Sequence, residues 1–580
     1  MGFNIEFLAK KLQEIAERTS KGTELWILKS LQIDFNLATL GVSFLIFIAF
    51  AALFLRSGVF VVGYILSDTL LYTESAYREA HGQWPGLNFL GGGAGALWWL
   101  PLALTYKLTG DLVASIPISF VAFASAVFVL SAYIAWTRLS AVIGCLVICF
   151  CSILVMAPWE IGSAISPWGS THTTAASGYN KLGFTLVLIA SLLAVDPKSA
   201  RQRTAARWDA VFALVCFGLA FYLKMPFGLG VAGMVCLWAS MLTKDRLQVW
   251  KFMAGVAVLF AVVELAIPGL NAAYIREMAM YAQIQPALDL YAIVRVIFQT
   301  GPEILVVGVL PVLALATQGL CKWSEFLFFF ALVAGSIVLL TVSTGGANLV
   351  APLAVAVVAL SVLARQSKTL LNRAPLWAAA VAFAFGFWTY FFPAANAIVR
   401  HNWYAGRSAP IENMPRSYSS LRVPSEIDLK PMIAAFDNRL SGADAYAAAR
   451  SKVPLSTINA LFVNEYAFTL TDLPNAQLLC GIAKERTAIL DTANVSSSLL
   501  GLQPVGGYTW AQFMRGYSES VHWPSDKMFL DVECLFDPKL PDNPAARDGL
   551  WLVYGAMIRD SFREVGETEF WRVFVRNDKR

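Results

Sequence analysis

Long apolar stretches dominate the first two thirds of the chain. A helix needs roughly 20 predominantly apolar residues to cross the hydrocarbon core of a bilayer. Stretches that approach or exceed this length fall at 37–57, 112–136, 140–157, 179–195, 209–223, 226–243, 252–268, 303–320, 326–342, 348–364 and 375–392. The pattern predicts a multi-pass α-helical membrane protein with about 11 spans.

The positions of lysine and arginine predict the orientation of these spans. Cytoplasmic segments of membrane proteins are enriched in both residue types. If the N-terminus is cytoplasmic, 17 of the 24 Lys and Arg within residues 1–392 fall on the cytoplasmic side. A cluster of four lies in 196–208, and it would move outside if 93–109 were a further span. We therefore expect 93–109 to be a juxtamembrane or re-entrant helix in the first external loop.

The last part of the chain has a different pattern. Residues 393–580 hold 41 of the 83 charged residues. Alternating apolar runs in this part predict strands, for example at 487–491, 532–536 and 571–575, and amphipathic stretches predict helices, for example at 428–440 and 550–565. Eleven spans place this part outside the cytoplasm, in the periplasm if the organism is Gram-negative.

Three parts are therefore expected along the chain. Residues 1–36 form an amphipathic lead-in on the cytoplasmic side, and residues 37–392 form the membrane domain, with external loops at 58–111, 158–178 and 269–302. Residues 393–580 form a soluble α/β domain on the external side.

Composition narrows the class of protein. Hydrophobic residues make up 57% of the chain and charged residues 14%, against about 25% charged in a soluble domain. This excludes a soluble enzyme, a disordered chain and a disulfide-rich secreted module. The net charge of +5 comes with no basic stripe interleaved with aromatic residues, so we expect no nucleic-acid partner. Of the eight Cys, only Cys480 and Cys534 lie in the tail, where they can pair if the tail is outside the cytoplasm.

The polar groups of the membrane part gather on one side of the expected topology. Acidic residues and histidines fall mainly in the external loops, whereas a transporter tends to place polar groups at mid-membrane. Only Lys224 and Glu264 approach such a position. The distribution favours an enzyme that works at the outer membrane surface on a substrate delivered by lipid.

The first external loop carries the most informative motif. Ser67-Asp68 comes soon after the first span, and a short amphipathic helix with Glu74, Arg78 and Glu79 comes next. A Gly-x-x-Pro turn (82–85) and an apolar surface helix follow. This order resembles the first external loop of the GT-C superfamily of polytopic glycosyltransferases, in architecture over about residues 37–400 and in motif over about 64–110.

The resemblance implies a GT-C-like fold and an activity. Members use polyprenyl-phosphate-linked sugars as donors, and Asp68 takes the position of their acidic residue, which implies a catalytic role as general base or acceptor-orienting group. Inverting transfer needs one carboxylate to take the acceptor proton while the phosphate leaves from the opposite face. The chain departs from the pattern at Asn88 and Gly91–Gly93, where many members have an acidic residue and a Pro motif. A second carboxylate, or a metal site built from two, is therefore in doubt.

Each residue of this loop also has a simpler interpretation. Asp68 can cap the helix that starts at Thr69. Glu74 and Glu79 can be solvated charges on a helix face, and Arg78 can pair with Glu74 at i+4. As substrate-binding residues we name Glu74, Arg78 and Asn88.

Two further segments add polar groups on the external side. The run 158–183 contains Glu160, His172, Tyr179 and Asn180, which we expect to bind substrate, and Lys181, which opens an apolar helix. A cation beside the free N–H groups of a helix N-terminus suits a lipid phosphate. Lys181 can equally be an interfacial residue that extends toward the membrane surface, and a lone loop histidine often has no role.

Other cations are expected to bind the donor phosphate. Lys224 lies in a Lys-x-Pro break between two spans, where an ionisable group is functional by default. Arg276 and Arg295 lie in the amphipathic loop 269–302, facing either lipid headgroups or the donor entrance.

The sequence thus favours a membrane glycosyltransferase, a hexosyl or pentosyl transferase. It would move a sugar from a polyprenyl-phosphate donor to an extracytoplasmic glycan, lipid or protein acceptor. Its partners are the donor, the acceptor and the bilayer of a bacterial inner membrane. No cofactor or metal site is indicated, although a divalent ion is compatible. A flippase of a lipid-linked glycan and a non-catalytic membrane scaffold remain alternatives.

Overall fold

The computed structural model describes most of the chain. The described residues are 33–62, 66–159, 175, 178–197, 199–243, 246–284, 290–342, 350–366, 374–410, 414–424, 466–467, 469–481, 485–512 and 517–577. Glu160, His172, the lead-in up to residue 32 and the expected helix at 428–440 lie outside them.

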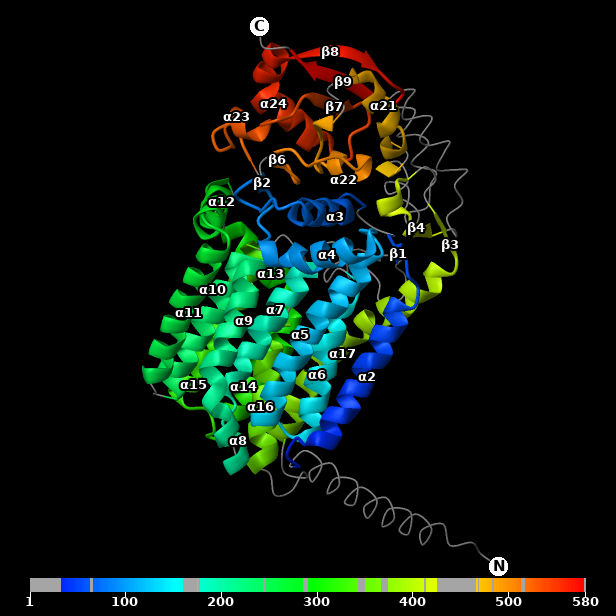
Figure 1. The fold of residues 1–580 in the computed structure, drawn as a ribbon. Helices are drawn as coiled ribbons and strands as arrows, with labels where there is room; N and C mark the ends of the chain where they lie inside the picture. The colour runs from blue at the N-terminus through cyan, green and yellow to red at the C-terminus, as the bar shows by residue number, and fades with distance from the viewer. Residues whose placement is uncertain are drawn as a thin grey trace, which may run out of the picture.

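A bundle of apolar helices forms the body of the molecule (Figure 1). Among the described residues, seven helices are long and apolar enough to cross a membrane, and four shorter apolar helices accompany them. Each overlaps one predicted span, which confirms the multi-pass helical class. The bundle helices are α2 (Leu37–Leu55), α5 (Ser115–Arg138), α6 (Ala141–Met156), α7 (Gly178–Ser191), α9 (Asp209–Leu223), α10 (Met225–Leu237), α11 (Arg246–Ala266), α13 (Leu290–Glu303), α14 (Leu310–Ala316), α15 (Trp323–Val342), α16 (Leu353–Gln366) and α17 (Ala374–Ala405).

The distribution of apolar side chains matches a bundle whose solvent is lipid. The helix α16 is buried along most of its length through small residues such as Ala354 and Ala359. The helix α11 instead exposes Val258 and Leu265. Helices that are apolar all round satisfy their own backbone hydrogen bonds, so they can face hydrocarbon without cost.

Two helices lie across one end of the bundle (Figure 1). They are α3 (Leu66–Ala80) and α4 (Ala96–Thr109), and α12 (Leu270–Ile284) lies beside them. As expected for residues 93–109, α4 runs across the bundle end and not along the spans. We call this the α3 end, and the opposite end, which carries α8 (Ala200–Ala205), the α8 end.

A small α/β region covers the α3 end (Figure 1). Its sheet has the order β5-β7-β9-β8, with β5 (Thr487–Ile489) parallel to β7 (Cys534–Pro538), and β9 (Trp571–Arg576) antiparallel to both of its neighbours. The α/β class of the tail is confirmed. The helix expected at 550–565 ends earlier, because α24 (Pro544–Ser561) gives way to strand β8 (Phe562–Glu567). A disulfide joins Cys480 and Cys534.

The first loop and the tail share backbone hydrogen bonds. Strand β1 (Phe60–Val61) pairs in parallel with β4 (Leu421–Pro424), and β2 (Phe89–Leu90) pairs in parallel with β6 (Gly507–Tyr508). The helix α17 also continues past residue 392, where the sequence indicates a boundary. The tail is therefore built into the α3 end and holds the two strands of the segment after α2, β1 and β2, in place.

Candidate functional site

The helix α3 places Asp68 at the interface between bundle and tail. Asp68 lies in its first turn and is half-buried, where a carboxylate interacts favourably with the helix dipole. The neighbouring Thr69 accepts a hydrogen bond from the backbone N–H of Ala175 (3.5 Å). One turn further, the Tyr72 hydroxyl is 2.8 Å from the Ser119 hydroxyl on α5. Contacts to separate segments thus hold the helix that carries Asp68.

A row of aromatic rings connects α3 to two other parts of the bundle. Tyr72 stacks on Trp98 of α4 with ring centroids 4.8 Å apart, and Trp98 meets the edge of Tyr179 at 5.9 Å. The Tyr179 ring in turn lies 4.7 Å from Nζ of Lys224, which is a cation–π distance. The structure therefore brings the helix of Asp68 together with the predicted residues Tyr179 and Lys224.

Lys224 occupies the break between α9 and α10. Its backbone is extended, with φ −164° and ψ 119°, and Pro226 opens the next helix. The loop before α4 packs against this break, since the Gly95 N–H donates to the Leu223 carbonyl (2.8 Å). A Cβ on Gly95 would lie 2.1 Å from the Tyr222 carbonyl oxygen, so only glycine fits there. The Lys224 side chain is 7% exposed, and burial lowers its pKa to about 8, which leaves it mainly protonated at neutral pH.

Two adjacent polar residues begin α7 in buried positions. Nζ of Lys181 donates to the Ala157 carbonyl at the end of α6 and lies 5.7 Å from the Phe120 ring centroid. Asn180 is 4% exposed, and neither amide atom has a hydrogen-bond partner among the described residues. An unsatisfied buried amide costs about 1–3 kcal/mol, and such groups in native proteins need a specific explanation. A ligand at this end of the bundle would provide one.

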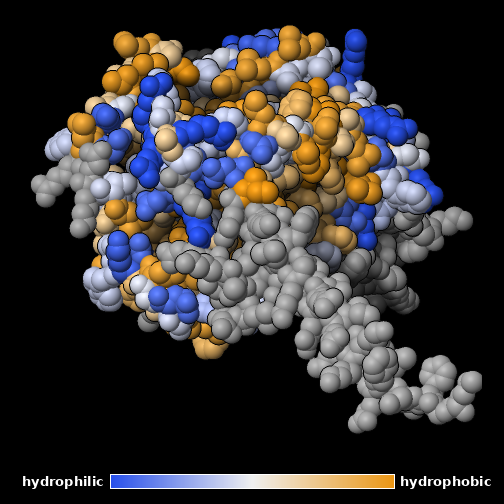
Figure 2. All heavy atoms as spheres, turned by 90° about the horizontal axis from the view of Figure 1, so that it is seen from below, coloured by the Kyte–Doolittle hydropathy of each residue, from blue (hydrophilic) through white to orange (hydrophobic). Residues whose placement is uncertain are grey.

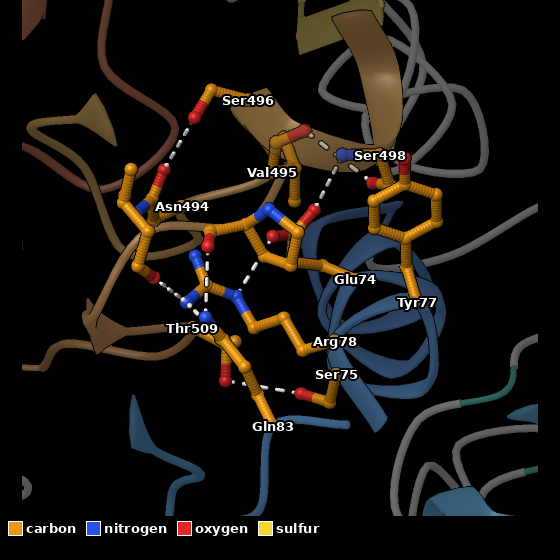
Figure 3. Close-up of polar contacts among 12 residues, drawn as sticks. Glu74, Ser75, Tyr77, Arg78, Gln83, Asn494, Val495, Ser496, Ser498 and Thr509 are labelled. Atoms are coloured by element: carbon orange, nitrogen blue, oxygen red, sulfur yellow. Dashed lines mark hydrogen bonds and ion pairs between the residues drawn. The ribbon is translucent and has the colours of Figure 1, made fainter. Parts of the chain in front are cut away.

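A buried ion pair joins α3 to the tail (Figure 3). Glu74 and Arg78 have fully buried side chains, with Nε of Arg78 2.8 Å from Oε1 of Glu74. The other Glu74 oxygen accepts from the Ser498 backbone N–H (2.9 Å), and Arg78 donates to the Val505 carbonyl. The expected i+4 pair is confirmed, and the interpretation of Glu74 as a solvated charge is wrong. That Glu74 and Arg78 contact a substrate stays a prediction.

The third ionisable residue of α3 is also buried. Glu79 is 5% exposed, and neither carboxyl oxygen has a hydrogen-bond partner among the described residues. Burial raises the pKa of Glu79 well above its ordinary value. The expectation of a solvated carboxylate is wrong here as well, because the tail and α4 cover a helix whose amphipathic pattern suggests exposure.

A second set of polar residues surrounds α12, and its central residue, Glu277, is given no role by the sequence analysis. Glu277 is 2% exposed, and its Oε1 accepts from the Gly91 N–H (3.0 Å) and the Tyr281 hydroxyl (3.1 Å). Burial raises the pKa of Glu277 to about 7. The loop with three consecutive glycines, Gly91–Gly93, is thus held against a carboxyl group. That contact spans 186 residues of sequence, so no local signal could reveal it.

The remaining predicted residues are placed elsewhere. Asn88 and Arg276 line a cleft on the tail side of α12, and Arg295 is exposed on α13. Glu160 and His172 fall in the part of the loop 158–178 that is outside the described residues. Within the described ranges, no group of three or more His, Cys, Asp or Glu side chains could hold a metal ion.

Comparison with known proteins gives structural similarity alone. No family model and no curated protein matches the chain. The structure is similar to that of ArnT from Cupriavidus metallidurans bound to undecaprenyl phosphate, with a TM-score of 0.43 and 14% identity over 92% of this chain and 98% of ArnT. The apo form of the same protein gives a TM-score of 0.42 and 14% identity over 91% of this chain and 97% of ArnT.

Proposed function

We propose that this protein is a GT-C-type membrane glycosyltransferase that takes its sugar from a polyprenyl-phosphate carrier. One observation carries the proposal: the α3 end gathers the carboxylate-bearing helix of Asp68 and the buried cation Lys224 through Tyr72, Trp98 and Tyr179. A carboxylate and a cation near the membrane edge are the groups that transfer from a lipid phosphate requires.

The proposed chemistry is a single inverting displacement. The carboxylate of Asp68 removes the proton from an acceptor hydroxyl, and the acceptor oxygen bonds to the anomeric carbon of the donor sugar. The bond between that carbon and the phosphate oxygen breaks on the opposite face. The polyprenyl phosphate leaves with the electron pair. Lys224, which contacts Tyr179 in the first turn of α7, and Lys181 in the same turn offset its negative charge.

The proposed reaction takes place outside the cytoplasm, so the α3 end must lie on the external side of the membrane. A disulfide between Cys480 and Cys534 fits an oxidising compartment such as the periplasm. The arginine-rich α8 then faces the cytoplasm, as the positive-inside rule expects. The sugar is a hexose or pentose, and the acceptor is a glycan, lipid or protein of the cell envelope.

The Asp68→Asn substitution tests this proposal. Membranes that contain the full chain are incubated with polyprenyl-phosphate hexose or pentose and with envelope extract, and the released polyprenyl phosphate is measured. We expect release by the unaltered protein and a loss of about 10²–10⁴-fold in the variant. Asp560→Asn, on the exposed face of α24, is the matched control and should retain full activity.

Two results would refute the assignment. One is full transfer by folded Asp68→Asn protein. The other is the absence of release from every donor by the unaltered protein, which would favour the flippase or the scaffold.

A further inference from the structure

A cleft lies where three distant parts of the chain meet. It has a volume of about 400 Å³ and lies between the turn 83–88, the helix α12 and the tail residues Gly506 and 523–531. Its lining includes Gln83, Asn88, Arg276, Glu277, Trp523 and Lys527. Small-molecule sites commonly have volumes of roughly 300–1,000 Å³, so the space suits one or two sugar rings.

The walls of the cleft are fixed by contacts outside it. Gly86 has a φ of +75°, and a Cβ there would lie 3.0 Å from the backbone of Ala273, which keeps the turn tight against α12. The Asn88 carbonyl accepts from the Gly507 N–H (3.3 Å), and the Gln83 amide donates to the Pro504 carbonyl (2.8 Å). The site is therefore formed before any ligand arrives, as most binding sites are.

Several polar atoms of the lining are left for a ligand. The Asn88 Oδ1 accepts from the Trp84 N–H (2.8 Å), so its amide N–H groups remain available. Arg276 donates from Nε to its own helix at Ala272 (3.3 Å), and its two Nη groups remain available. Glu277 is held through Oε1, whereas its buried Oε2 has no hydrogen-bond partner among the described residues.

The charges and the aromatic wall indicate the kind of ligand. Arg276 and Lys527 are countered by Asp531 and, to the extent that it is ionised, by Glu277, so the cleft carries little net charge. Trp523 adds a flat apolar surface, held by the hydrogen bond from the Tyr554 hydroxyl to its carbonyl (3.0 Å). Neutral sugars combine apolar C–H faces with hydroxyl groups that donate and accept.

We propose that this cleft binds a neutral sugar residue of the acceptor glycan. The proposal rests on the proposed function in one respect, namely that the bound glycan is the acceptor of the transferred sugar. A glycan held beside the first external loop would present its hydroxyl from the tail side of α3. The binding itself needs only the cleft.

Glycan binding by the full chain tests the proposal. Fluorescently labelled protein in phosphatidylglycerol nanodiscs is applied to an array of neutral and acidic bacterial glycans. We expect binding to neutral glycans, a loss of at least about tenfold in Trp523→Ala, and a similar loss in Arg276→Gln, whose exposed side chain makes misfolding a poor explanation. Trp403→Ala, an exposed tryptophan at the end of α17, is the control and should bind normally.

The outcomes separate this inference from the proposed function. Asp68→Asn should bind glycans as the unaltered protein does, even though it loses transfer. Binding of acidic glycans or inorganic phosphate only, no binding of any neutral glycan, or neutral binding that survives both cleft variants would overturn the inference. Full transfer by Asp68→Asn would overturn the catalytic role of Asp68, and no transfer by the unaltered protein would overturn the proposed function; both results would leave the cleft assignment standing.

Discussion

The two ends of the helix bundle use buried charges in different ways. At the α8 end, Arg138 and Asp209 form a buried pair at 2.5 Å, and the Tyr133 hydroxyl donates to the other Asp209 oxygen (2.7 Å). Arg138 also donates to Thr137 (2.9 Å). Figure 2 looks at this end and shows groups of hydrophilic residues beside broad hydrophobic areas. These charges hold α5 and α9 together.

The α3 end has a similar pair and keeps unsatisfied groups beside it. Glu74 and Arg78 are as deeply buried as Arg138. Among the described residues, however, the buried carboxyl oxygens without a hydrogen-bond partner belong to Glu79 and Glu277, which both lie at this end. Such groups lower stability, and native proteins retain them mainly at functional sites. Ser140, beside Arg138 at the α8 end, also has a hydroxyl without a partner in the described part of the chain, so the difference between the ends concerns carboxyl groups: those without a partner gather at the α3 end, where the proposed site lies.

The largest effect on stability is expected from breaking one of the two buried ion pairs, Arg138–Asp209 or Glu74–Arg78. Arg138→Met leaves Asp209 buried without its cation, which should lower the free energy of unfolding by about 3–5 kcal/mol, and Arg78→Met should cost a similar amount. Thermal unfolding in detergent measures both. Transfer per folded molecule should fall only in Arg78→Met, because Arg78 also fixes α3 to the tail at Val505. Normal stability with lost transfer in Arg138→Met would place the α8 end in the mechanism.

Glu277 is expected to make the free energy of unfolding depend on pH, with an effect of intermediate size. Burial raises its folded-state pKa to about 7 from an ordinary value near 4.5, so the folded state holds a proton that the unfolded state has released. The free energy of unfolding should therefore fall as pH rises from about 4.5 to 7, by about 3 kcal/mol in total.

Glu277→Gln removes this contribution. Unfolding midpoints of the variant and the unaltered protein are compared at about pH 4.5 and pH 7.5. The variant should gain stability relative to the unaltered protein at the higher pH. Parallel pH profiles for the two proteins would show that Glu277 is ionised at little cost and that this part of the α3 end is no different from the α8 end.

The sequence predicted the body of the fold well, whereas the roles of the predicted site residues stay predictions. Apolar stretches near 20 residues mark spans because lipid allows few alternatives, and charge placement kept 93–109 out of the bundle. The structure brings two other residues singled out from sequence, Tyr179 and Lys224, together with the helix of Asp68, since polar groups at the ends of neighbouring spans share one side of the bundle. The burial of Glu74 and Glu79 was missed, because their cover comes from segments such as Ser498 that lie more than 400 residues away.

The smallest effect on stability is expected from removing one hydrogen bond at each end of the bundle. The Ser75 hydroxyl donates to Oγ1 of Thr509 in the tail (3.0 Å), and Tyr133 donates to Asp209 at the α8 end. Ser75→Ala and Tyr133→Phe should each cost about 1 kcal/mol in thermal unfolding. Only Ser75→Ala should also slow transfer, by a few-fold, because it loosens α3 against the tail. Equal transfer rates in the two variants would mean that the tail does not position α3.

A structure of the protein with added decaprenyl phosphate tests the central claim most directly. The account predicts that the phosphate lies at the α3 end, within hydrogen-bond reach of Nζ of Lys224 and close enough to Asp68 for one sugar ring to fit between them. A phosphate bound at the α8 end, or separated from Asp68 by the packed rings of Tyr72 and Trp98, would contradict it.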